Sequence, residues 1–293
     1  MKIVILTDSS DRHLYFCNRI ISECDSVVGV FLGTKLTSKG FFAKIKDLYR
    51  RKIVLKTISN RLINLIFLSF RKKFEEEKIS QERLYFGRSE ELFEQEKSGI
   101  FCETVSSSIG SINSKIYIDK IKFLEPEVIV VMGSCLICSE IIGIAKHVLN
   151  MHTGLSPYYR GGYTNFWPIL NEEYGYFGVT VHKMSTGIDS GDIVYTARPK
   201  ITPEDTYGSI NSKAIILGTD LMIATINHLK NNNLVAEKQW IFGKLFHNYH
   251  FNNYCAYKYF MKKTKFINKF CKLDQEGKLD KVVVVSNGMR HDI

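Results

Sequence analysis

The sequence lacks the long apolar runs that membrane spans and exported proteins require. No stretch of about 18 or more uncharged apolar residues occurs in the 293 residues, which argues against a spanning helix. Only four apolar residues separate Lys2 from Thr7 and Asp8, too few for the apolar core of a signal peptide. We therefore expect a cytoplasmic protein.

The sequence also lacks a cysteine framework. Its seven cysteines are an odd, scattered set, which does not suit paired disulfides and fits a reducing compartment; they lie at 17, 24, 102, 135, 138, 255 and 271. Cys135 and Cys138 form a CxxC pair, but the pair lies in an apolar run with no second pair and no nearby histidine. We expect a packing role for these thiols and no bound metal.

The turn after the first apolar run has no glycine. Residues 2–7 and 26–32 are predicted strands on either side of a helix that ends near residue 22, which is typical of a doubly wound, parallel sheet. The connecting turn reads TDSSDRH without GxGxxG, so a bound dinucleotide is disfavoured.

Strands and helices alternate again after residue 100. Apolar runs predict strands over 101–105, 128–132, 148–152, 178–184 and 193–198. Periodic segments predict helices over 116–124, 139–147 and 206–230. The expected fold is a Rossmann-like, doubly wound α/β domain with a mostly parallel sheet over 1–230. A basic helical insertion at 36–95 interrupts it, and a short C-terminal extension, 231–293, follows.

Positive charge is concentrated in two segments. The net charge is +10, yet residues 41–73 alone hold ten Lys and Arg against one acid, and 258–272 holds six lysines. Such runs indicate an anionic partner or, equally, a solvated helix face. The basic insertion is also amphipathic, so it is expected to pack on the sheet, with covering the active site or resting on a membrane surface as alternatives.

An amide, an imidazole and a carboxylate lie at predicted strand ends. Asn150 and His152 are two apart on a strand, so they share a face, and Asp189 lies in a glycine-rich loop after the strand 178–184. The amide can donate to a developing oxyanion, and the imidazole can move protons. The carboxylate can orient the imidazole. This set suits acyl or formyl transfer to an amine, which is itself the nucleophile.

Three stretches around these residues resemble the formyltransferase family that uses 10-formyltetrahydrofolate. They are VIVVMG (128–133), NMHTGLSPYYRGG (150–162) and VTVHKMSTGIDSGDIV (179–194). The resemblance implies catalysis by Asn150, His152 and Asp189, with 10-formyltetrahydrofolate as co-substrate. It also implies a set of folate-binding residues: Met132, Gly133, Ser134, Leu136, Val181, Gly187 and Ile188.

The residues beside the predicted catalytic set are expected to bind the acceptor. They are Ser156, Tyr159, Arg160, Gly161, Tyr163, Asn165 and Trp167. Two further histidines, His147 and His182, flank the strands and are expected to be structural.

The family members that formylate nucleotide-linked amino sugars resemble the chain best. The tRNA enzymes carry a C-terminal barrel for which about 60 residues after 233 are too few, and the purine-pathway enzymes lack a basic insertion. The predicted acceptor is therefore a sugar nucleotide used in surface polysaccharide synthesis, whose diphosphate meets basic residues. A methionyl-tRNA formyltransferase, a formyltetrahydrofolate hydrolase and a nucleic-acid-binding module are the alternatives.

Three partner interactions complete the expectations. No stable nucleic-acid partner is expected. Contact of residues 41–73 with a membrane surface and assembly into a homodimer are kept as alternatives.

Overall fold

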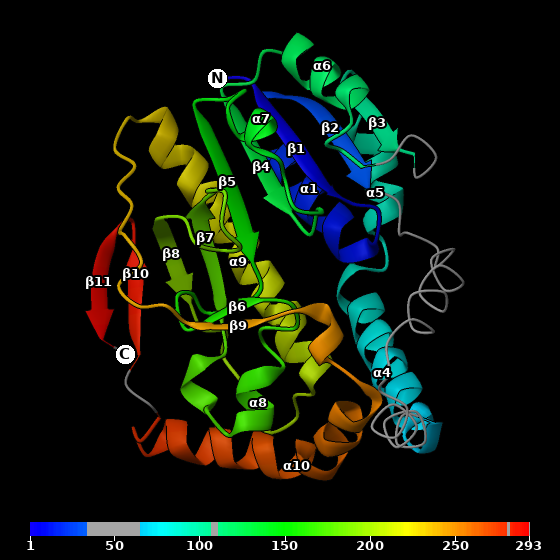
Figure 1. The fold of residues 1–293 in the computed structure, drawn as a ribbon, viewed down its shortest axis with the longest axis vertical. Helices are drawn as coiled ribbons and strands as arrows, with labels where there is room; N and C mark the ends of the chain where they lie inside the picture. The colour runs from blue at the N-terminus through cyan, green and yellow to red at the C-terminus, as the bar shows by residue number, and fades with distance from the viewer. Residues whose placement is uncertain (34–64, 107–110, 280–281, 293) are drawn as a thin grey trace, which may run out of the picture.

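The described residues, 1–33, 65–106, 111–279 and 282–292 of a computed structural model, build one large sheet covered by helices on both faces (Figure 1). The strand order is β11-β10-β8-β7-β5-β4-β1-β2-β3. Much of the predicted basic insertion, residues 36–64, lies outside the described residues, and so does most of the basic segment 41–73.

Five strands form the parallel half of the sheet: β1 (Ile3–Asp8), β2 (Val27–Gly33), β3 (Phe101–Val105), β4 (Val128–Met132) and β5 (His147–His152). Their order, 3-2-1-4-5, is that of a Rossmann-like sheet. Because the core of this half is buried from both sides, β4 consists entirely of buried apolar residues. The predicted α/β fold class is confirmed.

The remaining strands pair antiparallel beyond β5. They are β7 (Val179–Lys183), β8 (Ile193–Ala197), β10 (Val283–Ser286) and β11 (Met289–Asp292). Residues after 230 thus add two strands to the same sheet. Their hairpin turns at Asn287 and Gly288, both with positive φ, as a two-residue hairpin turn requires. A second small sheet pairs β6 (Tyr159–Gly161) with β9 (Lys244–Phe246).

Helices cover the two faces unequally. On one face, α1 (Asp11–Glu23) and α9 (Tyr207–Lys230) lie against the strands, with α5 (Ser89–Glu96) packed on α1, α4 (Leu68–Phe86) packed on α1 and α9, and α10 (Asn253–Gln275) packed on α4. The other packs against α6 (Lys115–Phe123) and α7 (Ser139–Ile142), and the short α8 (Trp167–Asn171) lies near α10. No helix in the described parts of the chain is long and apolar enough to cross a bilayer.

Three sequence expectations change at this level. The helix expected over 139–147 is a single turn, because Gly143 caps it and His147 already belongs to β5. The C-terminal extension, 231–293, which was expected to follow the domain, forms β9, α10 and the β10–β11 hairpin, and the hairpin joins the main sheet. In the described part of the insertion, Phe74 and Phe86 of α4 are buried in the main core. Helix α4 therefore packs mainly on α1, α9 and α10, whereas the insertion was expected to pack on the sheet.

Candidate active site

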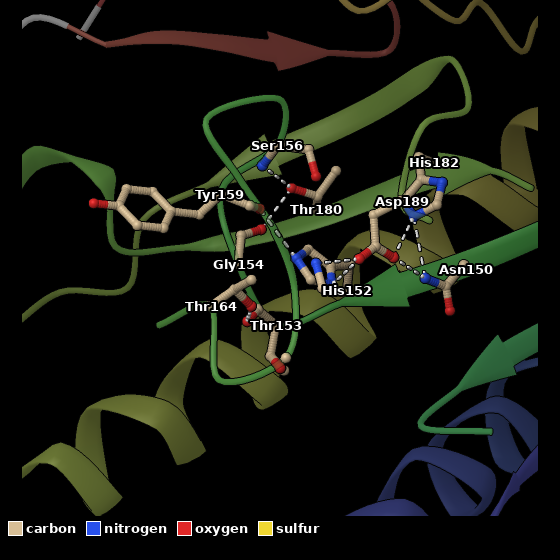
Figure 2. Close-up of polar contacts among 12 residues, drawn as sticks. Asn150, His152, Thr153, Gly154, Ser156, Tyr159, Thr164, Thr180, His182 and Asp189 are labelled. Atoms are coloured by element: carbon tan, nitrogen blue, oxygen red, sulfur yellow. Dashed lines mark hydrogen bonds and ion pairs between the residues drawn. The ribbon is translucent and has the colours of Figure 1, made fainter. Parts of the chain in front are cut away.

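Strand β5 and the loop after β7 bring the predicted catalytic residues together (Figure 2). On β5, Leu149 and Met151 point into the core toward α9, so Asn150 and His152 project from the opposite face. The loop after β7 folds back over that face and carries Asp189, whose φ is +45°. Asp189 from this loop therefore joins Asn150 and His152, which the Asn-x-His spacing predicted to lie on one face of the strand.

Asp189 is the centre of the cluster. Its Oδ2 accepts a 2.8 Å hydrogen bond from the Gly161 amide and lies 3.4 Å from His152 Nδ1. Its Oδ1 lies 3.5 Å from Asn150 Nδ2. One carboxylate thus contacts both other predicted catalytic residues.

Burial sets the protonation state of His152. The ring is buried, and this desolvation lowers the pKa of His152 below its usual 6.5, although the Asp189 carboxylate works in the opposite direction. The ring is therefore neutral at pH 7 and able to take a proton. Its Nε2 lies 3.3 Å from the Tyr159 carbonyl oxygen, so both ring nitrogens face acceptors. An imidazolium formed during a reaction would be stabilised at both ends.

Asp189 is held ionised. Burial alone would raise its pKa, but the interactions with the His152 and His182 imidazoles and the hydrogen bond from the Gly161 amide lower the pKa of Asp189 well below its usual range. The buried charge is thus compensated by surrounding donors, as a buried carboxylate requires.

His182 was expected to be structural, yet it is part of the cluster. Its Nδ1 lies 2.8 Å from the Lys183 carbonyl oxygen, so this nitrogen carries the proton and Nε2 is an acceptor. Asn150 Nδ2 donates to that Nε2 over 3.1 Å, which fixes the orientation of the amide. The pairing of Asn150 with His182 across β5 and β7 was not visible without the strand register.

Close packing around His152 depends on Gly154. A Cβ at this position would lie 2.5 Å from His152 Nε2 and 2.5 Å from Thr164 Oγ1. Thr164 Oγ1 donates to the Thr153 carbonyl, and Thr180 Oγ1 donates to the Gly154 carbonyl (Figure 2). The loop after β5 is therefore pinned closely against the imidazole.

Gln239, in the tail, holds the Asp189 loop from outside. Its Nε2 donates to the carbonyl oxygens of Asp189 (2.7 Å) and Gly191 (2.9 Å). Reciprocal backbone hydrogen bonds between Ile193 and Glu237 anchor the segment nearby. Sequence analysis missed Gln239 because a lone glutamine in an irregular tail has no motif around it.

The residues predicted to bind folate lie in two loops that flank β5. Gly133, Ser134 and Leu136 follow β4, and Leu136 is 72% exposed; Gly187 and Ile188 precede Asp189. Asn113 pins the first loop, since its amide donates to the Leu136 carbonyl and accepts from the Cys138 amide. The side chains of Met132 and Val181 are buried in the core.

The predicted acceptor residues divide into two groups. Tyr163 and Asn165 line a pocket beside the cluster. The others occupy interior or structural positions: Ser156 is buried, Tyr159 donates its hydroxyl to Glu173, Arg160 and Gly161 lie in β6, and Trp167 stacks on Phe246 with centroids 4.3 Å apart. The side chains of Ser156, Tyr159 and Trp167 are all buried.

Two hollows differ in their relation to this cluster. The pocket lined by Tyr163 and Asn165 has a volume of about 350 Å³ and includes Thr153, the residue after His152. A larger hollow of about 610 Å³ lies between Lys122 and Glu140, next to the amino ends of β4 and β5. Ligands of open α/β sheets bind at the carboxyl ends of the strands, so the smaller pocket is the relevant one.

Within the described ranges, no group of three His, Cys, Asp or Glu residues is arranged to hold a metal ion. Cys135 and Cys138 are both free thiols in the loop after β4, and the packing role expected for them holds only for the partly buried Cys138, since Cys135 is exposed.

Comparison with known proteins gives a consistent result. A family model described as "Formyl transferase" matches residues 78–226, which is half of the chain. Methionyl-tRNA formyltransferases are similar in sequence: 32% identity over 124 residues for Clostridium beijerinckii and 36% over 124 residues for Alkaliphilus metalliredigens. Each match covers 42% of this chain and about two fifths of the relative (40% and 39%), so the similarity concerns one part of those enzymes.

Solved structures share the fold at low sequence identity. A 4-N formyltransferase from Francisella tularensis has a TM-score of 0.52 and 17% identity, covering 85% of this chain and 77% of that one. A glycinamide ribonucleotide transformylase from Symbiobacterium toebii has a TM-score of 0.54 and 13% identity, covering 82% and 92%. A sugar N-formyltransferase from Shewanella sp. has a TM-score of 0.51 and 16% identity, covering 86% and 78%.

Proposed function

Because the chain belongs to the formyl transferase family, we propose that it transfers a formyl group from 10-formyltetrahydrofolate to a primary amine. The observation that carries this proposal is the contact of one ionised carboxylate, Asp189, with both Asn150 and His152. A neutral imidazole and an oriented amide beside one another are the groups that amine acylation needs.

Each residue has a defined role in the proposed reaction. The amine nitrogen forms a bond to the formyl carbon, and the bond from that carbon to the folate nitrogen breaks. His152 takes a proton from the attacking amine and returns one to the leaving nitrogen. Asp189 stabilises the transient imidazolium. Asn150 has one amide hydrogen committed to His182, so its second, with only the 3.5 Å contact to Asp189, is available to the formyl oxygen.

The loops beside β5 suit the folate co-substrate. The loop Gly133–Leu136 and the loop at Gly187 offer exposed backbone on two sides of the cluster, and the exposed Leu136 adds apolar surface. The flat, polar-edged ring of folate would form hydrogen bonds with backbone groups there and would be covered by the Leu136 side chain. We assign folate binding to Gly133, Ser134, Leu136, Gly187 and Ile188.

The proposed acceptor is the amino group of a nucleotide-linked amino deoxysugar of the kind used for surface polysaccharides. A sugar N-formyltransferase has the same fold, so the fold accommodates such an acceptor. The pocket beside His152 is lined by polar and cationic side chains, which suits a hydroxylated, phosphorylated molecule.

The test measures tetrahydrofolate release from 10-formyltetrahydrofolate with a panel of nucleotide-linked amino sugars. We expect turnover with at least one sugar and its loss in Asn150→Ala, His152→Ala and Asp189→Ala. His147→Ala, which removes a half-buried histidine at the start of the same strand, is the matched control and should retain activity. No turnover with any amine would refute the proposal, and formate release without an amine would indicate a hydrolase.

The identity of the relatives favours a second candidate acceptor. All the curated enzymes named above are methionyl-tRNA formyltransferases. Methionyl-tRNA therefore belongs in the same assay. If the wild-type protein formylates methionyl-tRNA and formylates none of the amino sugars, the acceptor is methionyl-tRNA and not a sugar nucleotide. The proposed formyl-transfer chemistry would then still hold.

A further inference from the structure

The pocket beside His152 has a cationic wall built by two helices. Arg12 comes from the first turn of α1, and Arg71 and Lys78 come from α4. The rest of the lining is polar or aromatic: Thr153, Tyr163, Thr164, Asn165, Tyr207, Asn211 and Asn248. No carboxylate is among these lining residues. The pocket therefore presents three positive side chains and hydrogen-bonding groups to whatever enters it.

Two carboxylates pair with the three cations of this wall, so their negative charges do not neutralise all of the positive charge. Glu82 pairs with Arg12 over 3.0 Å, and Glu75 lies 3.9 Å from Arg71 and 3.6 Å from Lys78. One acid is thus shared by two bases, which leaves a positive excess. Among the described residues, the Nε atom of Arg12 is buried and has no hydrogen-bond partner. Such a donor is costly to leave unpaired, so it favours an anionic ligand.

Aromatic packing holds the wall in place. The Arg71 guanidinium lies 4.5 Å from the Phe251 ring centroid and donates to the Phe251 carbonyl oxygen. The Tyr163 ring also stacks on the Phe251 ring, with centroids 4.2 Å apart. Arg71 is thereby preorganised, and a bound anion would not have to order a free side chain.

The pocket adjoins the reaction centre at the carboxyl edge of the sheet. Thr153 directly follows His152, and Arg12 follows β1 at the same edge, where α/β sheets bind their ligands. Figure 2 shows Thr153 and Thr164 next to His152. A volume of about 350 Å³ is at the lower end of small-molecule sites and fits a phosphorylated sugar, not a whole domain of a partner.

We propose that Arg12, Arg71 and Lys78 bind the diphosphate of the acceptor, so that part of the insertion forms the acceptor site. This inference rests on the proposed function, which places the reacting amine at His152. The same geometry gives α4 a binding role in addition to its packing on the core. The ligand class is a nucleoside diphosphate or its sugar conjugate.

Direct binding tests this assignment without requiring turnover. The probes are dTDP, UDP, GDP and inorganic pyrophosphate, titrated calorimetrically into the wild-type chain and into Arg71→Ala and Lys78→Gln. Each variant should weaken binding of the preferred probe about tenfold or more, and added salt should weaken it further. Lys72→Ala is the matched control: it removes the same charge from the same helix at a side chain that is 80% exposed and does not line the pocket, and affinity should change less than twofold.

A second ligand separates this proposal from the enzymatic one. Binding of 5-formyltetrahydrofolate, measured by fluorescence, should be unchanged in Arg71→Ala and Lys78→Gln, which also shows that the variants are folded. If none of the four probes binds the wild-type protein, or if both variants bind them as tightly as the wild type, the diphosphate site is refuted. A short RNA that binds more tightly than the nucleotides, and loses affinity in the same variants, would also overturn it.

Discussion

Replacing Asp189 with asparagine removes the one charge that contacts both other predicted catalytic residues. The side chain keeps its size, so the loop with φ of +45° need not move. What changes is the stability of a protonated His152. At 3.4 Å, a unit charge pair at an effective dielectric constant of about 20 is worth about 5 kcal/mol. This attraction acts only when the imidazole is charged, which in the proposed reaction is in the transition state.

The expected result is a large loss of turnover with the fold intact. Converting about 5 kcal/mol at about 1.4 kcal/mol per tenfold gives a decrease in kcat of roughly three orders of magnitude or somewhat more. The pKa of His152, already lowered by burial, should fall further in Asp189→Asn because the opposing carboxylate is gone.

Two measurements check this. Tetrahydrofolate release gives kcat, and NMR titration of ring-labelled histidine, assigned with His152→Ala, gives the pKa in the absence of any acceptor. Asp192→Asn removes an equal charge from the same loop at a residue outside the cluster and should alter neither quantity strongly. A kcat within tenfold of wild type, or an unchanged titration of His152 in Asp189→Asn, would refute the role given to the carboxylate.

Four further outcomes follow from the contacts. Gly154→Ala should abolish most activity and lower the midpoint of urea unfolding, because the new Cβ would lie 2.5 Å from both His152 Nε2 and Thr164 Oγ1; the circular dichroism spectrum without urea checks that the fold is retained. Gln239→Leu should lower kcat more than it raises KM for folate, and it should shift the pH profile of kcat, because the Asp189 loop loses two hydrogen bonds. Gln239→Glu keeps the size of the side chain but not its N–H donors, so it should have the same effects. Phe74→Ala should cost about 3–5 kcal/mol in urea unfolding, because the ring is buried among aromatic side chains of four segments. Stability should fall as pH drops below 6.5, since the unfolded chain binds a proton at His152 that the folded protein, with its lowered His152 pKa, does not; urea unfolding of His152→Gln should show a shallower dependence on pH.

Local patterns were enough for the parallel half of the sheet. The continuous apolar run at 128–132 coincides with β4, because a strand buried on both faces needs apolar residues throughout. The predicted strand 148–152 matches β5 within a residue, although Asn150 and His152 interrupt its apolar residues. The helix over 139–147 was wrong because Gly143 stops it after one turn. The Asn287-Gly288 pair is a sequence signal for a two-residue hairpin turn, but it lies in a basic, aromatic tail where no strands were predicted.

Contacts between distant segments were beyond the reach of sequence patterns. His182 meets Asn150 only because β7 pairs antiparallel with β5 in one register, and a single-residue shift would turn the histidine to the other face. Gln239 reaches the Asp189 loop from 50 positions away. Arg12 and Lys78 share a pocket because α1 and α4 pack against each other.

The sequence by itself determined the α/β class, the Asn-x-His pair on one strand face and the stretches that resemble formyltransferases. Those features depend on residue spacing and local propensity, which act along the chain. Only the tertiary structure decided that Asp189 touches both members of the pair, that His182 orients the amide, and that α4 supplies cations beside His152. Such contacts depend on strand register and helix packing, which are set by the whole core and not by any one segment.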